Sequence, residues 1–267
     1  MSRIRVLVSG ACGRMGSEVV RAVMAEADLE LVGAVDPRSA GEDAGRSAGL
    51  PDCGIAVSRD LESALAKSRP DVAIDFTEPG AALTNALAVV KHGARPVIGT
   101  TGIPKEGIEY LRQTITEKGS AGLLAPNFAI GAVLLMKFAA EAVRYLPDCE
   151  IIELHHDGKK DAPSGTSIYT AELIAKSRAG EDISRPKVDE QIIIPGVRGG
   201  RSHEIPIHSV RLAGFVASQE VIFGGPGQTL SLRHDTIDRK CFMPGVILAA
   251  RRIPALTGFF YGLESIL

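Results

Sequence analysis

The chain has 267 residues, of which 45% are hydrophobic and 23% are charged. This is enough apolar material for one large core or two modest ones, and we expect two domains. A net charge of −2 excludes a broadly basic surface, so we expect no nucleic-acid partner. The sequence has neither the hydrophobic core of a signal peptide nor an apolar run of about 18 residues, so we expect no proteolytic processing and no membrane span. The four widely spaced cysteines form no Cys-x-x-Cys pair, which favours a reducing, cytoplasmic location without disulfides.

The first half of the chain alternates short apolar runs with helical patterns. Strands are expected at Ile4–Ser9, Leu29–Val35, Asp71–Phe76, Pro96–Gly99 and Gly122–Ala125, and helices at Glu18–Ala27, Gly80–His92 and Lys105–Lys118. Strands that alternate with helices predict an α/β fold with a Rossmann-like, doubly wound parallel sheet.

The second half changes character. A helix is expected at Gly131–Tyr145, strands at Glu150–His156, Ile205–Leu212, Glu220–Phe223 and Thr229–His234, and a last helix at Met243–Arg252. The short strands and glycine turns predict an α+β domain with a mostly antiparallel sheet, and the last helix is expected to return to the first domain. We therefore assign residues 1–127 and 238–267 to one domain and 128–237 to the other.

Three glycines follow the first strand and open the first helix. Gly10, Gly13 and Gly16 are spaced Gly-x-x-Gly-x-x-Gly. Glycines in this context let the backbone approach a diphosphate and leave helix amides facing the anion, so the turn predicts dinucleotide binding. The plainer interpretation is an ordinary tight strand-to-helix turn.

An acidic residue ends the second strand. Asp36 lies about twenty residues beyond Gly16, where a carboxylate accepts hydrogen bonds from the adenine-ribose hydroxyls of NAD. It could also simply introduce the Asp-Pro turn. Arg38 follows two positions later and suits the 2′-phosphate of NADP, so the choice between the two cofactors stays open.

Small polar residues follow three further strands. These segments are Asp75–Thr77, Gly99–Gly102 and Ala125–Phe128. Ligands of a doubly wound sheet bind at the carboxyl ends of its strands, so these turns are expected to line the nicotinamide half of the site. Taken singly, each is equally consistent with a turn that binds nothing.

The most informative segment, Glu153–Thr166, joins a strand to a helix. Adjacent His155 and His156 point to opposite faces of a strand and no third ligand follows, which disfavours a metal site. Histidine and Lys159 can exchange protons or hold a carboxylate, although both histidines could equally be interior residues. Ser164–Thr166 is either a plain helix N-cap or a second anion site formed by first-turn amides.

At these residues the chain resembles the 4-hydroxy-tetrahydrodipicolinate reductase family, also called dihydrodipicolinate reductase. The resemblance rests on E-L-H-H-D-G-K-K-D-A-P-S-G-T, preceded in the family's order by V-S-G-A-C-G-R-M-G, D-F-T, V-I-G-T-T-G and A-P-N-F-A-I-G. These motifs are specific, and the similarity extends over nearly the whole chain.

The resemblance implies reduction of 4-hydroxy-tetrahydrodipicolinate by NADH or NADPH, with loss of water, in lysine and diaminopimelate biosynthesis. It implies that His155 is the proton donor or acceptor and Lys159 the other proton donor, while His156 and the amides of Gly165 and Thr166 hold substrate carboxylates. The residues that it places against the cofactor are Gly10, Ala11, Cys12, Gly13, Arg14, Met15, Asp36, Gly99, Thr100, Thr101, Ala125, Pro126, Asn127 and Phe128.

The resemblance also implies a homotetramer assembled through the sheet of the second domain, which would make residues 128–237 the substrate-binding and oligomerisation domain. One departure concerns the cofactor: many members carry arginine directly after the acidic residue of the second strand, where this chain has Pro37, and a strong NADP preference is therefore in doubt.

Other charged residues carry no matching motif. Surface or interface positions are expected for His92, His203, His208 and His234. The basic loop Arg198–Arg201 suits either closure over an acidic substrate or an ordinary solvated turn.

Two alternatives stay open at this point. One is another nicotinamide-dependent reductase with this architecture, which substrate profiling would separate. The other is a dinucleotide-sensing protein without chemistry, against which His155, Lys159 and the Ser164–Thr166 turn argue.

Overall fold

The computed structural model describes residues 3–178 and 191–267. The chain divides into two compact units, which are described separately. Unit 1 comprises Met1–Ala129 and Arg239–Leu267, and unit 2 comprises Ile130–Asp238. Among the described residues, no helix combines the length and the hydrophobicity needed to cross a bilayer.

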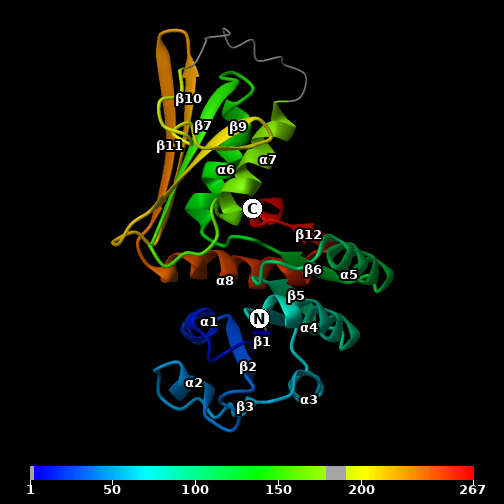
Figure 1. The fold of residues 1–267 in the computed structure, drawn as a ribbon. Helices are drawn as coiled ribbons and strands as arrows, with labels where there is room; N and C mark the ends of the chain where they lie inside the picture. Colours follow the sequence, from blue (N-terminus) through cyan, green and yellow to red (C-terminus); the bar gives the residue numbers. More distant parts are fainter. Residues whose placement is uncertain (1–2, 179–190) are drawn as a thin grey trace. The chain divides into compact units, whose positions relative to one another are not determined.

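Unit 1 contains a parallel sheet. Its strands, taken over the described residues, are β1 (Ile4–Ser9), β2 (Leu29–Val35), β3 (Val57–Ser58), β4 (Val72–Asp75), β5 (Arg95–Ile98), β6 (Ala121–Leu124) and β12 (Gly258–Tyr261). They pair in the order β12-β6-β5-β4-β1-β2-β3 (Figure 1). The strand order reverses direction between β1 and β4, and ligands of doubly wound folds bind at the carboxyl ends beside such a reversal.

Helices cover both faces of this sheet. They are α1 (Arg14–Ala25), α2 (Ala44–Ser47), α3 (Leu61–Ser68), α4 (Pro79–Lys91), α5 (Lys105–Glu117) and α8 (Met243–Arg252), with 3-10 turns at Arg239–Phe242, Ile253–Ala255 and Leu263–Ile266. Helices α1 and α8 pack together on one face, and α3, α4 and α5 pack on the other. Because neither face meets water, the interior strand β1 is apolar throughout its middle, where Val6, Leu7 and Val8 are fully buried.

Several elements of unit 1 differ from the sequence predictions. Helix α1 begins at Arg14 and not at Glu18, because the glycine turn leads directly into the first helical turn. Strands β3 and β12 and helices α2 and α3 were not predicted. Phe259 of β12 pairs with Gly122 of β6, so this short segment becomes a strand through a sheet edge supplied by distant residues.

Unit 2 contains a mixed sheet with helices on one face. Its described strands are β7 (Asp148–His155), β8 (Gly200–Ser202), β9 (Ile205–Arg211), β10 (Ala217–Gly225) and β11 (Gln228–Thr236), in the order β11-β10-β7-β9-β8, and its helices are α6 (Ile130–Ala142) and α7 (Gly165–Ser177) (Figure 1). All pairs are antiparallel except β7 with β9. The prediction of a mostly antiparallel sheet is therefore confirmed.

The strand β7 alternates between two environments. Cys149, Ile151 and Glu153 are buried, whereas the residues between them are only partly buried. Successive side chains of a strand point to opposite faces, so the buried set lies beneath α6 and α7. Burial of Glu153 among these apolar neighbours is unusual for a carboxylate and requires a partner.

The glycine turn of unit 1 tolerates no side chain at its end. A Cβ atom on Gly16 would lie 1.9 Å from the carbonyl oxygen of Gly10, whereas nothing lies within 4 Å of a Cβ atom on Gly80 in α4. We expect Gly16→Ala to lower the free energy of unfolding by about 1–3 kcal/mol through overpacking. Gly80→Ala should stabilise the protein by about 0.4–1 kcal/mol. Denaturant unfolding of both variants measures the difference, and equal stabilities would contradict the close packing of this turn.

Candidate functional site

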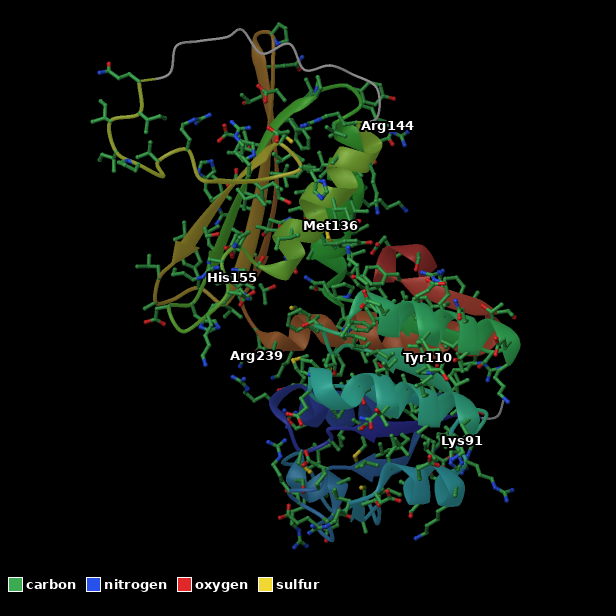
Figure 2. All side chains as sticks on the ribbon, turned by 45° about the vertical axis from the view of Figure 1, so that its right-hand side comes forward. Lys91, Tyr110, Met136, Arg144, His155 and Arg239 are labelled. Carbon is green, nitrogen blue, oxygen red and sulfur yellow. The ribbon has the colours of Figure 1, made fainter. Side chains whose placement is uncertain are left out.

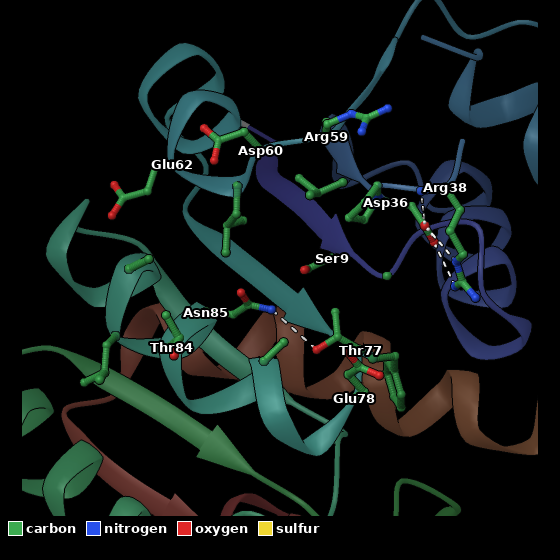
Figure 3. Close-up of a pocket in the computed structure, with 18 of the residues that line it drawn as sticks. Ser9, Asp36, Arg38, Arg59, Asp60, Glu62, Thr77, Glu78, Thr84 and Asn85 are labelled. Carbon is green, nitrogen blue, oxygen red and sulfur yellow. Dashed lines mark hydrogen bonds and ion pairs between the residues drawn. The ribbon is translucent and has the colours of Figure 1, made fainter. Parts of the chain in front are cut away.

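A hollow of about 940 Å³ opens in unit 1 at the carboxyl ends of the central strands. This volume suits a nucleotide-sized ligand. Figure 3 shows the hollow between α3 and α4, with Asp36 and Arg38 at one side. Its lining residues are Ser9, Gly10, Val35, Asp36, Pro37, Arg38, Arg59, Asp60, Leu61, Glu62, Phe76, Thr77, Glu78, Ala81, Thr84, Asn85, Leu87, Ala88 and Lys91.

The glycine turn borders this hollow. Gly10 has a φ of +75°, and a Cβ atom there would lie 2.6 Å from the carbonyl oxygen of Phe76. Gly13 is the N-cap of α1 and has no side chain to occupy the first-turn amides, and no acidic residue lies in that turn. Such a helix start is suited to a phosphate anion.

Asp36 is buried, with 1% of its surface exposed. It accepts hydrogen bonds from the backbone amides of Cys12 at 3.2 Å and Arg38 at 3.1 Å. Burial alone would raise the pKa of Asp36, but the hydrogen bonds and the Arg38 charge outweigh it and lower that pKa. Its carboxylate therefore links the glycine turn to the end of β2.

The Arg38 side chain also contacts Asp36. Its Nε lies 3.2 Å from Oδ1 and its Nη2 3.3 Å from Oδ2 (Figure 3), while 79% of the Arg38 side chain is exposed. The two residues that suggested opposite cofactor preferences are thus an ion pair. The guanidinium remains accessible to a ligand at the rim of the hollow.

The turns after β4, β5 and β6 interact with one another. The hydroxyl of Thr100 donates to Asp75 at 2.9 Å, and so does the hydroxyl of Thr77 at 2.7 Å. The rings of Phe76 and Phe128 lie 5.8 Å apart between centroids. A Cβ atom on Gly99 would lie 2.1 Å from the Phe76 ring, which explains glycine at that position.

Five residues that the sequence analysis placed at the cofactor are among the lining residues of the hollow: Gly10, Asp36, Arg38, Phe76 and Thr77. Ala11–Met15 form the turn and the start of α1, and Gly99–Thr101 and Ala125–Phe128 lie at and beyond the ends of β5 and β6. Sequence analysis missed the contributions of α3 and α4 to the hollow. Asp60 was detectable as a helix N-cap, since it accepts from the amide of Ser63 at 2.8 Å, but no motif marks Thr84, Asn85 or Lys91.

The predicted catalytic residues lie in unit 2, at the end of β7 and in the loop after it. His155 is the last residue of β7 (Figure 2), and its Nδ1 is hydrogen-bonded to Glu153. Lys159 donates to both oxygens of Asp161 at 2.8 and 2.9 Å, and its side chain is 20% exposed. His156 is exposed. The two histidines therefore have different environments, as the alternation of a strand predicts.

Glu153 is the charged centre of this region. Its Oε1 accepts from Nη2 of Arg211 at 2.7 Å, and the hydroxyl of Ser209 also hydrogen-bonds to the carboxylate. Burial alone would raise the pKa of Glu153, but the hydrogen bonds from His155, Arg211 and Ser209 outweigh it and lower the pKa to about 2. The carboxylate is therefore ionised at neutral pH.

The start of α7 is anchored by buried polar side chains. Ser164 is the N-cap, and its Oγ accepts from the amide of Ser167 at 3.2 Å. The hydroxyl of Ser167 donates to Oε1 of Gln219 at 2.8 Å, and Nε2 of Gln219 donates to the hydroxyl of Thr170 at 2.8 Å. This network, which sequence analysis missed, joins the first turn of α7 to β10. Ser164 is thus a plain cap, and the first turn that follows it carries Gly165 and Thr166.

The remaining histidines have protein partners or ordinary positions. His92 pairs with Glu62, and Nε2 of His208 donates to the carboxylate of Glu150 at 2.8 Å. Burial lowers the pKa of His234. His203 has a φ of +51° in the turn between β8 and β9. No group of three or more metal-ligating side chains occurs in residues 3–178 and 191–267.

The basic loop before β9 is held by protein contacts. Arg198 donates to Glu150 at 2.8 Å, and Arg201 donates to the carbonyl oxygen of Glu204 at 3.0 Å. A smaller hollow of about 390 Å³ lies beside it, lined by Ala162, Pro163, Gly196, Gly199, Gly200, Arg201, Ile207 and Ser209. These contacts favour the interpretation of this loop as an ordinary solvated turn over its closure on an acidic substrate.

Comparison with known proteins accounts for the whole chain. The family model described as dihydrodipicolinate reductase, N-terminus, matches residues 4–128, and the model described as dihydrodipicolinate reductase, C-terminus, matches residues 131–267. The chain is 48% identical to the 4-hydroxy-tetrahydrodipicolinate reductase of Moorella thermoacetica, covering 100% of this chain and 99% of the relative. It is 47% identical to that of Listeria monocytogenes, covering 99% and 100%.

Solved structures agree with this result. The dipicolinate-bound dihydrodipicolinate reductase from Paenisporosarcina sp. TG-14 has a TM-score of 0.88 and 41% identity over 99% of this chain and 100% of that one. An amine dehydrogenase from Mycobacterium smegmatis has a TM-score of 0.69 at 15% identity, covering 100% of this chain and 96% of that one, and shares the fold.

The network at the start of α7 generates a prediction. Gln219→Leu leaves the buried hydroxyls of Ser167 and Thr170 without their amide partner, and we expect the free energy of unfolding to fall by about 1–3 kcal/mol. Gln228→Leu, at an exposed position in β11, should change it by no more than about 0.5 kcal/mol. Denaturant melts compare the two, and a Gln219→Leu protein as stable as the Gln228→Leu protein would refute the anchoring role.

Proposed function

The chain belongs to the dihydrodipicolinate reductase family, and from this premise we propose how its residues reduce 4-hydroxy-tetrahydrodipicolinate. The enzyme is an NAD(P)-dependent oxidoreductase of lysine and diaminopimelate biosynthesis. The overall reaction adds one hydride and one proton to the substrate ring and releases one water, giving tetrahydrodipicolinate. NADH or NADPH, when bound, supplies the hydride.

Three proton transfers add up to this net uptake of one proton: one proton leaves the ring and one joins the departing hydroxyl group as water forms, and one joins the ring after hydride addition. In this proposal His155 and Lys159 carry out these transfers. His155 exchanges a proton through Nε2, since its Nδ1 is bound to Glu153. The ammonium group of Lys159, held by Asp161, donates the other proton and stabilises the negative charge that hydride addition creates on the ring. The observation that carries the proposal is that Nη2 of Arg211 donates both to Glu153, which holds His155, and to the backbone oxygen of Asp161, whose side chain holds Lys159.

The first turn of α7 binds the acid groups of the substrate. The backbone amides in the first turn of an α-helix have no hydrogen-bond acceptor within the helix, and the helix dipole favours an anion at this end. Gly165 and Thr166 lie in this turn, and nothing lies within 4 Å of where a Cβ atom of Gly165 would stand. His156, which is exposed, would bind a carboxylate beside them. The Paenisporosarcina relative was solved with dipicolinate, a planar dicarboxylate.

The dinucleotide belongs to unit 1. Gly10–Met15 would hold its diphosphate at the start of α1, and Asp36 would receive the adenine ribose beside the hollow. Gly99–Thr101 and Ala125–Phe128 would support the nicotinamide. The positive φ of Gly10 and the absence of a side-chain cap at Gly13 fit this group, because both leave backbone close to the anion.

We also propose an assembly and a location. The sheet face opposite α6 and α7 carries the half-buried aliphatic side chains of Ile152, Leu154 and Ile222, which supports association of copies through this sheet, as in a homotetramer. Residues 128–237 would thus serve both substrate binding and oligomerisation. The four cysteines, all among the described residues, form no disulfide, which supports a cytoplasmic location.

One assay tests the function and the roles of the catalytic residues. Loss of absorbance at 340 nm on addition of substrate should be fast in the native enzyme and inhibited by pyridine-2,6-dicarboxylate. We expect His155→Ala and Lys159→Ala each to lower kcat by on the order of 10²-fold or more, because each removes a positioned proton donor. Lys160→Ala, which changes the exposed neighbour, should retain kcat.

The outcomes of this assay separate the alternatives. Binding of NADH without turnover would indicate a dinucleotide sensor, and turnover with other substrates alone would indicate a different reductase. If both His155→Ala and Lys159→Ala retain the native kcat, the proposed roles are wrong.

The ion pair at the rim of the hollow leads to a prediction about cofactor choice. Arg38 places an exposed positive charge next to Asp36, where a 2′-phosphate would distinguish NADPH from NADH. We expect Arg38→Ala to lower kcat/KM with NADPH by about tenfold, the value of one charge-assisted hydrogen bond, and to leave kcat/KM with NADH nearly unchanged. Parallel titrations measure both, and equal losses would show that Arg38 does not discriminate.

A further inference from the structure

The buried carboxylate of Glu153 has a defined set of donors. Arg211 and Ser209 reach it from β9, and His155 reaches it from two residues further along β7. On the other side, the cross-strand neighbour in β10 is Gln219, a neutral side chain that is already engaged with α7. Glu153 therefore faces one permanent positive charge, Arg211, and one ring that can carry a proton.

An ionised carboxylate fixes which nitrogen of His155 carries the proton. It accepts hydrogen bonds and has no proton to donate, so Nδ1 of the neutral His155 ring must be the protonated nitrogen. The His155 ring hydrogen-bonds to the described residues through Nδ1 alone. Nε2 is consequently left with its lone pair for exchange with another molecule.

We propose that Glu153 is a positioning residue of the reductase: it holds the Nδ1–H group of His155 and so commits Nε2 to proton exchange with the substrate. This inference rests on the proposed function, because it gives a physical basis to the role of His155. The arrangement follows the general logic in which a buried carboxylate sets the tautomer and orientation of a catalytic imidazole.

Arg211 extends the arrangement to the loop that carries the lysine. The same Nη2 that donates to Glu153 also donates to the backbone oxygen of Asp161 at 2.7 Å, and the Asp161 side chain holds Lys159. The guanidinium thus connects the carboxylate behind His155 to the backbone beside Lys159. The ion pair between the buried Glu153 and the partly buried Arg211 thus stabilises the positions of both His155 and Lys159.

Glu153→Gln tests the proposal because an amide has only one acceptor oxygen, whereas a carboxylate has two. The Arg211 guanidinium can only donate, so the amide oxygen must stay toward Arg211 and the NH₂ group must turn toward Nδ1 of His155. We expect the ring to change to the tautomer with the proton on Nε2, detected by ¹⁵N chemical shifts of the ring. We also expect kcat to fall by about 10²-fold or more, with KM for the substrate little changed. Glu153→Asp keeps the charge and should recover a substantial part of kcat.

The same strand supplies a matched control. Glu150 also bonds an arginine and a histidine, Arg198 at 2.8 Å and His208 at 2.8 Å, but it lies on the opposite face of the sheet. Glu150→Gln should therefore leave both the ¹⁵N signals of His155 and kcat unchanged. A loss of kcat equal to that of Glu153→Gln would indicate a general effect of altering this strand and would contradict the proposal.

The native enzyme provides a test that needs no variant to fold. A neutral His155 ring with its proton on Nε2 would overturn the inference, as would a Glu153→Gln enzyme with native kcat. The ¹⁵N chemical shifts of the His155 ring report the change of tautomer without any catalytic turnover. A chain that shows the inversion but does not oxidise NADH or NADPH with the substrate would contradict the proposed function and leave the Glu153–His155 arrangement intact.

Discussion

The ionised, fully buried carboxylate of Glu153 is the constraint on which the geometry of unit 2 depends. A charge without solvent must be compensated locally, and Arg211, Ser209 and the His155 ring all turn toward it. The Glu153 carboxylate thereby sets the orientation of each of these three side chains. The side chains of β7, the end of β9 and the loop at Asp161 are connected in this way without any metal ligand set among the described residues.

Each unit has a candidate anion site at the start of a helix, but the two helix starts differ in how their first turn is capped. Helix α1 begins after Gly13, where no side-chain cap is present and glycines bring the backbone close to whatever binds. Helix α7 begins after Ser164, which satisfies the amide of Ser167, and the buried Gln219 fixes the turn to β10. A diphosphate requires close backbone approach, whereas a small dicarboxylate requires a rigid turn with defined direction. The two helix starts would meet these two requirements in the function that we propose.

Many elements were predictable because their causes are local. The alternation of apolar runs and helical patterns predicted β1, β2 and α5 almost to the residue. The glycine spacing, Asp36 and the Glu153–Thr166 segment indicated the important regions for the same reason. Features that depend on distant partners were not predictable: β12 forms on the edge that β6 provides, and the hollow forms where α3 and the predicted helix α4 lie beside the end of β2.

The sequence alone determined the parallel and mostly antiparallel sheets, the glycine turn and the family resemblance, since periodicity and short motifs depend on neighbouring residues. Only the tertiary structure decided that Asp36 and Arg38 form an ion pair, and that Glu153 is charged and holds Nδ1 of His155. For Glu153 the physical reason is that the protonation and hydrogen bonding of a buried group depend on its neighbours in space, which here include Arg211 of β9 and Gln219 of β10. These residues lie more than fifty positions away along the chain and approach only when the sheet forms.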